Sequence, residues 1–139
     1  MMDSKIVQKA NQMLKKAPTV HLGVVDESGY PVVMAMSIIN PESISEIYLS
    51  TNLDSNKSKS LQKNNKASVC YSTNENNITL VGEAEILTDQ ETKSKCWQNW
   101  FIEIYQGGET DPNYCIIKFT TKRASLFIDH DASEFEITK

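Results

Sequence analysis

The chain has 139 residues, of which 40% are hydrophobic, so it has the size and apolar content of one ordinary domain with a sizeable core. Fourteen basic and eighteen acidic residues give a net charge of −4, which argues against a protein that binds nucleic acid. No apolar run reaches membrane-spanning length and the N-terminus lacks a signal-peptide pattern. We therefore expect one domain over residues 1–139, located in the cytoplasm and without a membrane partner.

The cysteines and histidines predict no metal site. Cys70, Cys96 and Cys115 lie far apart and form no C-x-x-C pair, and only His21 and His130 could join them. Buried, reduced thiols are the expected state of such cysteines in an intracellular protein.

The N-terminal part predicts a helix followed by a β-hairpin. Asp3 and Ser4 can cap a helix with one apolar face, and Pro18 prevents its continuation. An alternating strand begins at Val20 and leads into the turn at 26–29, which closes the hairpin.

The return strand, residues 31–39, is apolar on both faces. Both faces of such a strand should be covered, and a small barrel has more apolar surface than one subunit can cover, so we expect a homodimer. Asn40 and Pro41 mark the next turn, and a third strand follows over residues 47–51.

A polar segment joins this third strand to a short helix. Asp54 and Ser55 are good N-cap residues. Leu61 follows Lys57 at one helical turn, so the helix should run to about Asn64. A helix N-terminus presents free backbone N–H groups, and a Ser hydroxyl and a Lys ammonium beside them suit a phosphate group. The alternative is an ordinary capped helix with solvated lysines, which the segment alone favours.

The second half of the chain is rich in strands. Residues 67–71 and 78–87 alternate, and Gly82 interrupts the longer strand, as expected at a bulge or a barrel corner. Residues 114–120 and 124–128 predict a final hairpin, and the tail adds a short edge strand. Six or seven short strands with helices around them predict a mainly β (α+β) fold, a small antiparallel barrel with peripheral helices.

Asp89 can cap a second long helix. We expect its aromatic side chains to pack in the core. Its apolar face comprises Cys96, Trp97, Trp100, Phe101 and Ile104.

Several short motifs occur in a fixed order along the chain. They are Gly29-Tyr-Pro31, Leu49-Ser-Thr51, Ser55-Asn-Lys57 with Leu61, Asn64, Gly82-Glu-Ala84, Asp89 and Asp111-Pro112-Asn-Tyr114. From about residue 13 to 128 this series resembles the pyridoxamine 5′-phosphate oxidase-like flavoproteins, and within them the general-stress-protein branch. The resemblance implies a six- to seven-stranded FMN-binding split β-barrel and a homodimer with two flavin sites between the subunits. It also makes phosphate binding the favoured interpretation of Ser55 and Lys57.

The resemblance implies a set of contacts to FMN. Ser55 and Lys57 would hold the phosphate, with Lys59 as a second candidate. Two strand segments would line the isoalloxazine ring and the ribityl chain. Their residues are Met34, Ala35, Met36 and Ser37 in one segment, and Leu49, Ser50, Thr51 and Asn52 in the other.

One position departs from the family pattern. Many relatives have Gly-x-Pro-x-x-Arg-Pro-Met, in which the Arg contacts the phosphate, whereas this chain has Gly29-Tyr-Pro-Val-Val-Met34-Ala-Met36. A charge-assisted hydrogen bond to a phosphate is worth about 1.5–3 kcal/mol, so its loss should weaken FMN binding about tenfold to a hundredfold.

Two functional hypotheses follow. The first is an FMN-dependent oxidoreductase that acts on an unknown small molecule, in which FMN carries the hydride or electron chemistry and no catalytic side chain stands out. The second is a non-catalytic stress-related protein that binds a flavin or another ligand, and Met34 favours it somewhat.

Overall fold

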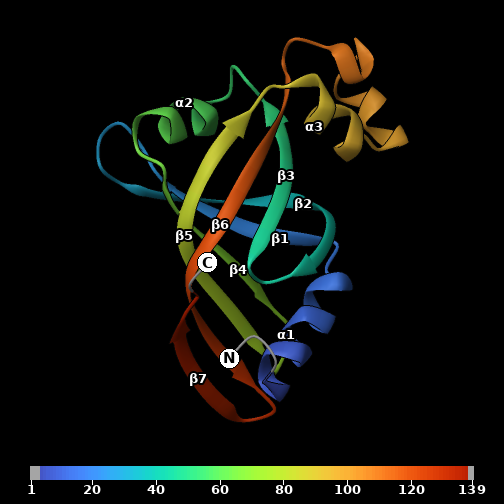
Figure 1. Ribbon diagram of the computed structural model, residues 1–139. Helices are drawn as coiled ribbons and strands as arrows, with labels where there is room; N and C mark the ends of the chain where they lie inside the picture. The colour runs from blue at the N-terminus through green and yellow to red at the C-terminus, as the bar shows by residue number, and fades with distance from the viewer. Residues whose placement is uncertain (1–3, 138–139) are drawn as a thin grey trace.

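The computed structural model describes residues 4–137 and contains seven antiparallel strands (Figure 1). The strands are β1 (Thr19–Val25), β2 (Pro31–Ser43), β3 (Glu46–Asn52), β4 (Lys66–Ser72), β5 (Asn77–Leu87), β6 (Tyr114–Ile128) and β7 (Asp131–Glu136). Their order is β3-β2-β1-β4-β5-β6-β7, and β3 also pairs with β6. Six strands therefore close into a barrel and β7 extends the sheet beyond it, which confirms the predicted fold class.

Helices lie around the barrel. They are α1 (Lys5–Lys15), α2 (Asn56–Lys63) and α3 (Gln90–Cys96), with the 3₁₀ turns η1 (Asn99–Glu103) and η2 (Gly108–Thr110) after α3. Helices α2 and α3 lie at the same end of the barrel, while α1 lies toward the other end (Figure 1). The Ser4 side chain caps α1 by accepting a hydrogen bond from the backbone N–H of Val7, as predicted, and Asp3 lies outside the described residues.

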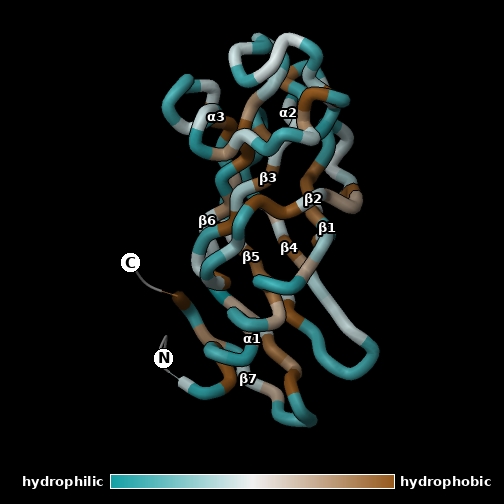
Figure 2. The backbone as a smooth tube through the Cα atoms, turned by 90° about the vertical axis from the view of Figure 1, so that its right-hand side faces the viewer, coloured by the Kyte–Doolittle hydropathy of each residue, from teal (hydrophilic) through white to brown (hydrophobic). Residues whose placement is uncertain are grey.

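The alternation of residues in the strands places the core inside the barrel. In β1, Val20, Leu22 and Val24 are buried, whereas His21 is exposed on the opposite face, as the sequence predicts. Figure 2 shows hydrophobic residues along the strands and hydrophilic ones in the loops at the ends. A second, smaller cluster lies between the barrel and α3 with η1; its buried members are Ile39, Cys96, Phe101, Tyr105, Tyr114 and Ile116.

The turn predicted at Asn40-Pro41 is wrong, because β2 continues to Ser43. Asn40 has φ of 38°, and the pairing of β2 with β3 shifts its register between Ile39 and Ser43. A bulge tolerates both an Asn in the left-handed region and a Pro without an N–H group, so turn-forming residues here bend the strand without ending it.

The hairpin predicted over residues 114–128 is also wrong, because β6 is one continuous strand. Thr121, in the polar middle of this segment, is buried and donates a hydrogen bond from its Oγ1 to the carbonyl of Ile44. The bend lies instead at Gly82 of β5, as predicted: the register shifts there, and a Cβ atom would lie 2.0 Å from the carbonyl oxygen of Thr120. The predicted edge strand in the tail is β7, which pairs with β6.

The long helix predicted from Asp89 ends at Cys96. Trp97 is extended, with φ of −62° and ψ of 135°. Its ring packs edge-on against two other rings, with centroid distances of 5.6 Å to Phe101 and 5.2 Å to Tyr114. The chain after Cys96 thus packs its aromatic rings together and does not continue the helix. The expected core packing is therefore met by Phe101 and in part by Trp97, whereas Trp100 is 46% exposed.

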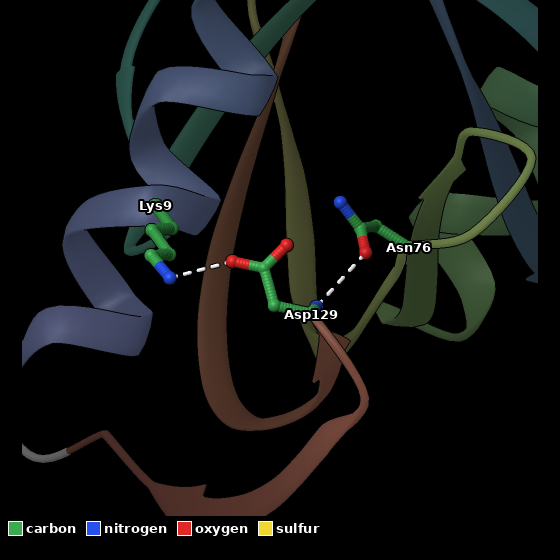
Figure 3. Close-up of polar contacts among 3 residues, drawn as sticks. All are labelled: Lys9, Asn76 and Asp129. Carbon is green, nitrogen blue, oxygen red and sulfur yellow. Dashed lines mark hydrogen bonds and ion pairs between the residues drawn. The ribbon is translucent and has the colours of Figure 1, made fainter.

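The turn between β6 and β7 is fixed from two sides (Figure 3). Asp129 and His130 have φ of 53° and 70°, a conformation that suits a tight hairpin. Lys9 of α1 forms an ion pair with the Asp129 carboxylate, and the backbone N–H of Asp129 donates a hydrogen bond to Asn76 Oδ1 (Figure 3). The turn thereby joins α1 to the β4–β5 loop.

Candidate functional site

A cleft of about 740 Å³ lies between the β1–β2 hairpin and helix α2. This volume lies within the range of about 300–1,000 Å³ that small-molecule sites occupy. One wall comes from the hairpin and the other from the first turns of the helix. Met34, Lys57 and Lys59, three of the site residues expected from the sequence, line this cleft.

The wall from the hairpin is apolar along its two strands. The strand residues that line it are Val24, Val32 and Met34, and the hairpin turn adds Asp26, Glu27 and Ser28. Val24 pairs with Val32, and Met34 with Leu22, so the side chains of this wall are on the face of the hairpin that carries the barrel core. Met34 thus shares the cleft with the first turns of α2, and it offers only apolar contact in this wall.

The wall from α2 is polar and basic. Ser55 caps the helix, and its Oγ accepts a hydrogen bond from the backbone N–H of Ser58 at 3.2 Å. The Lys57 ammonium donates to Thr51 Oγ1 at 3.1 Å, which uses one of its three N–H donors. Neither Lys57 nor Lys59 forms an ion pair with a carboxylate within residues 4–137.

Two carboxylates also line the cleft, and both have partners. Asp26 Oδ1 accepts hydrogen bonds of 2.9 Å from the backbone N–H groups of Ser28 and Tyr30, which stabilises the hairpin turn. Glu27 pairs with Lys63 at 3.1 Å. Glu27 is thus paired with a cation, whereas Asp26 keeps its negative charge in the hairpin turn, and the lysines without a carboxylate partner lie on the α2 side.

The other predicted site residues do not line this cleft. Successive residues of a strand point to opposite faces, so a run of four neighbours divides between two surfaces. Met36 and Leu49 are buried in the barrel core, and Ala35 is exposed on the outer face. The remaining residues of the two segments, Ser37, Ser50 and Asn52, are half-buried.

Ser55 and Thr51 do not line the cleft, but they lie next to each other beside it. Their side-chain oxygens lie 3.4 Å apart, and Thr51 is the partner of the Lys57 ammonium. Thr51 thus holds Lys57 directly, and Ser55 contacts Thr51. Whether any of these residues contacts FMN stays a prediction.

The thiol nearest to this cluster is not activated. Cys115 Sγ donates to the carbonyl of Thr51, and burial raises the pKa of the thiol to about 11, although the nearby Ser58 hydroxyl, Lys93 and Lys57 oppose this shift. Burial likewise raises the pKa of Cys96. Both thiols are therefore protonated at neutral pH, and neither is activated as a thiolate.

The structure adds contributors that sequence reasoning missed. Asp26 and Glu27 reach the cleft only because the hairpin folds over α2. Asn113 holds the loop before α2, and its only local signal is the Asp-Pro-Asn-Tyr motif. Over residues 4–137, no three His, Cys, Asp or Glu residues gather to hold a metal ion. In the same range, no helix is long and apolar enough to cross a membrane.

The fold is similar to that of several solved structures. A Clostridium acetobutylicum protein related to general stress protein 26 of B. subtilis, described as of the pyridoxinephosphate oxidase family, is 28% identical, with a TM-score of 0.86 over 97% of this chain and 96% of that chain. General stress protein 26 from Bacillus anthracis is 22% identical, with a TM-score of 0.78 over 99% and 100% of the two chains. A nimc/nima family protein from Clostridium acetobutylicum is 18% identical, with a TM-score of 0.73 over 94% and 93%. The last two show the fold alone.

The sequence itself matches one family model, described as pyridoxamine 5′-phosphate oxidase like, over residues 5–137. No curated protein matches the chain. The resemblance inferred from the order of motifs is thereby confirmed for the family, and the 28% identical structure is a protein related to general stress protein 26. With a family model that covers nearly all of its length, the chain belongs to the pyridoxamine 5′-phosphate oxidase-like proteins.

Proposed function

We propose that the cleft between the β1–β2 hairpin and α2 binds FMN, and that the protein is an FMN-dependent oxidoreductase acting on a small molecule not yet identified. One observation carries this proposal: two lysines without carboxylate partners in the described chain face an apolar strand wall across a cleft of about 740 Å³. A molecule with a phosphate at one end and a flat ring at the other fits such a cleft.

The residues present fit the phosphate end. The backbone N–H groups in the first turn of α2 have no partners within the helix, and the helix dipole favours an anion there. The Ser55 cap is a neutral hydroxyl, so the helix N-terminus keeps its positive character. Lys57 and Lys59 add two positive charges beside it.

The residues present also fit the ring end. Val24, Val32 and Met34 give an apolar wall against which a flat ring can pack. Bound FMN supplies hydride or electron transfer, and the protein binds and orients it and excludes water from the ring. The proposed role of the side chains that line the cleft is binding and orientation.

The proposed assembly is a homodimer. Val33, on the outer face of β2, is 65% exposed, and Tyr30 at the start of this strand is 69% exposed. Val33 pairs with Gly23, which pairs with Ser68 of β4, so small side chains extend this outer face into a surface suited to close packing. A second copy is the expected cover for this surface.

The second candidate function is a non-catalytic protein that binds a flavin or another ligand. Met34 favours it, because this side chain lines the cleft where many relatives carry a phosphate-binding Arg. Binding and catalysis are separate measurements, so the two candidates can be distinguished.

Titration of the purified protein with FMN and with riboflavin, followed by flavin fluorescence, tests the proposal. We expect saturable FMN binding. Lys57→Ala should weaken FMN binding about tenfold to a hundredfold, because a charge-assisted bond is worth about 1.5–3 kcal/mol, and should leave riboflavin binding unchanged. Lys95→Ala, which removes an exposed lysine from α3, is the matched control and should change neither.

A protein that binds no FMN, or a Lys57→Ala variant in which both flavins weaken equally, would reject the assignment. Steady-state oxidation of NAD(P)H by the FMN-loaded protein then separates the two candidates. Turnover supports the oxidoreductase, and flavin binding without turnover with either nucleotide supports the non-catalytic protein.

A further inference from the structure

The segment before β6 lies against the segment after β3, although about sixty residues separate them in sequence. Strands β3 and β6 are neighbours in the barrel, and both reach the end that carries α2 and α3 (Figure 1). The β3 end continues through Asn52, Leu53 and Asp54 to Ser55, the cap of α2. The loop that leads to the proposed phosphate site is therefore held at the barrel end by the start of β6.

Asn113 makes most of these contacts. Its backbone carbonyl accepts a hydrogen bond from Leu53 N–H at 2.8 Å, and its side-chain Oδ1 accepts one from Asp54 N–H at 3.1 Å. Its Nδ2 donates to Asn52 Oδ1 at 3.1 Å. One residue thus satisfies polar groups of three consecutive residues, the last of β3 and the first two of the loop, and the two loop residues have no regular secondary structure to satisfy them otherwise.

Asn113 is itself held in place. Its backbone N–H donates to Asp111 Oδ1 at 2.9 Å, and the other carboxylate oxygen accepts from Gly107 N–H at 3.0 Å. The carbonyl of Asp111 accepts from the Lys93 ammonium at 2.9 Å. Lys93 is only 5% exposed, so this support comes from a charge that is itself fixed in the fold.

The loop transmits its position to the cleft through the first turn of α2. The carbonyl of Asn52 accepts hydrogen bonds from Ser58 Oγ at 2.8 Å and from Ser55 N–H at 3.1 Å. Ser55 then caps the helix, and Lys57 reaches back to Thr51. A loop that moves would carry the helix N-terminus and Lys57 with it, because these bonds form one connected set.

We infer that Asn113, through its contacts to Asn52 and Asp54, is a positioning residue that sets the N-terminus of α2 and Lys57 for the phosphate group of the ligand. This inference rests on the proposed function, because it assumes that a phosphate binds there. Asn113 does not line the cleft, so it acts through the loop and not by touching the ligand.

The test compares Asn113→Ala with Asn64→Ala. Asn64 is at the opposite end of α2, where its Oδ1 accepts a hydrogen bond from Lys66 N–H at 3.1 Å, so its loss removes a similar bond from the same helix away from the cleft. FMN and riboflavin affinities are measured for both variants and for Lys57→Ala. Amide hydrogen exchange at Leu53 and Asp54 is followed in the same variants without ligand.

Asn113→Ala should weaken FMN binding about threefold to tenfold, the loss of one or two side-chain hydrogen bonds, and leave riboflavin binding unchanged. The amides of Leu53 and Asp54 should exchange faster. Asn64→Ala should change neither the ratio of the two affinities nor these amides. If Asn113→Ala does not fold, Asn113→Ser keeps a small polar side chain that is too short for both contacts, and the same ratio applies to it.

The outcomes separate this inference from the function on which it rests. If the wild-type protein binds no FMN, the proposed function is overturned and the inference with it. If Lys57→Ala weakens FMN binding but Asn113→Ala does not, only the inference is overturned. Equal weakening of FMN and riboflavin in Asn113→Ala, with a loss of stability like that of Asn64→Ala, would show a purely structural role and also overturn it.

Discussion

Helices α2 and α3 lie at the same end of the barrel, and both begin with a side-chain cap (Figure 1). Ser55 accepts a hydrogen bond from the N–H three residues ahead, and Asp89 does the same with Thr92. The caps differ in charge. Asp89 brings a carboxylate to the N-terminus of α3, and Glu91 adds another in the first turn, whereas the first turn of α2 has no acidic residue.

The lysines of the two helices also differ. In α3, Lys93 is buried and donates to the carbonyl of Asp111, while Lys95 pairs with Glu91. In α2, Lys57 and Lys59 face the cleft. The N-terminus of α3 therefore has two carboxylates of its own chain beside it, whereas α2 has a neutral cap and no acidic residue in its first turn. An N-cap hydrogen bond stabilises a helix in both cases, and the charge of the cap decides what else can bind there.

The largest expected effect comes from increasing the charge of the cleft opposite α2. Met34→Arg places a guanidinium in the apolar wall, where it can donate two N–H groups to phosphate oxygens. FMN binding should tighten by about 1.5–3 kcal/mol, and the gain should shrink as salt rises, since it is an attraction between charges. Titration calorimetry with FMN at two salt concentrations measures this.

Met34→Leu is the control for Met34→Arg, because it changes the shape of the wall without charge and should give no gain. If the cleft has been remodelled for a ligand without phosphate, the Arg would be left unpaired. The variant would then melt at a lower temperature without any gain in FMN affinity, and the account of a weakened FMN site would be wrong.

The second prediction gives α2 the type of cap that α3 has. Ser55→Asp keeps a good N-cap, so the free energy of unfolding should change little. Its carboxylate would stand where the phosphate is proposed to bind, and two unit charges about 4 Å apart repel by about 1 kcal/mol or more. We expect FMN binding to weaken about fivefold or more while riboflavin binding stays the same. Unchanged FMN affinity would place the phosphate away from this helix.

The sequence predicts both caps, because a cap depends on residues within one turn. The same holds for Gly82 and for the alternation in β1, where local spacing determines the fold. The errors lie where distant packing decides. Thr121 looks like part of a polar turn, but its hydroxyl bonds to the carbonyl of Ile44, and the strand continues through it. Trp97 fits a helix by its spacing, but α3 ends before it, and its ring packs against Tyr114 from a distant strand.

The candidate site divides in the same way. Ser55 and Lys57 can be recognised locally, because a strand, a loop and a helix N-terminus follow one another in the chain. Asp26 and Asn113 cannot, since the first depends on how the hairpin folds over α2 and the second on the pairing of β3 with β6. The prediction that all of residues 34–37 line one site is also too coarse, because successive side chains of a strand point to opposite faces of the sheet.

The smallest expected effect concerns the Asp89 cap of α3 and the free energy of unfolding. Hydrogen bonds from the Thr92 hydroxyl and backbone N–H hold the pKa of Asp89 below its usual value in the folded protein. A carboxylate whose pKa is lower when folded stabilises the protein above its unfolded pKa, and this stabilisation is lost as the pH falls through the folded pKa. Asp89→Asn keeps a good cap without charge. It should therefore lower the free energy of unfolding slightly at pH 7, and the difference from wild type should vanish in acid, below the usual range for an aspartate. Urea unfolding of both proteins across this pH range measures the difference.

The FMN affinity of Asp89→Asn should equal that of wild type, because the α3 cap lies outside the proposed FMN cleft. A change in FMN affinity as large as that of Ser55→Asp would mean that the two helix ends do not have separate roles.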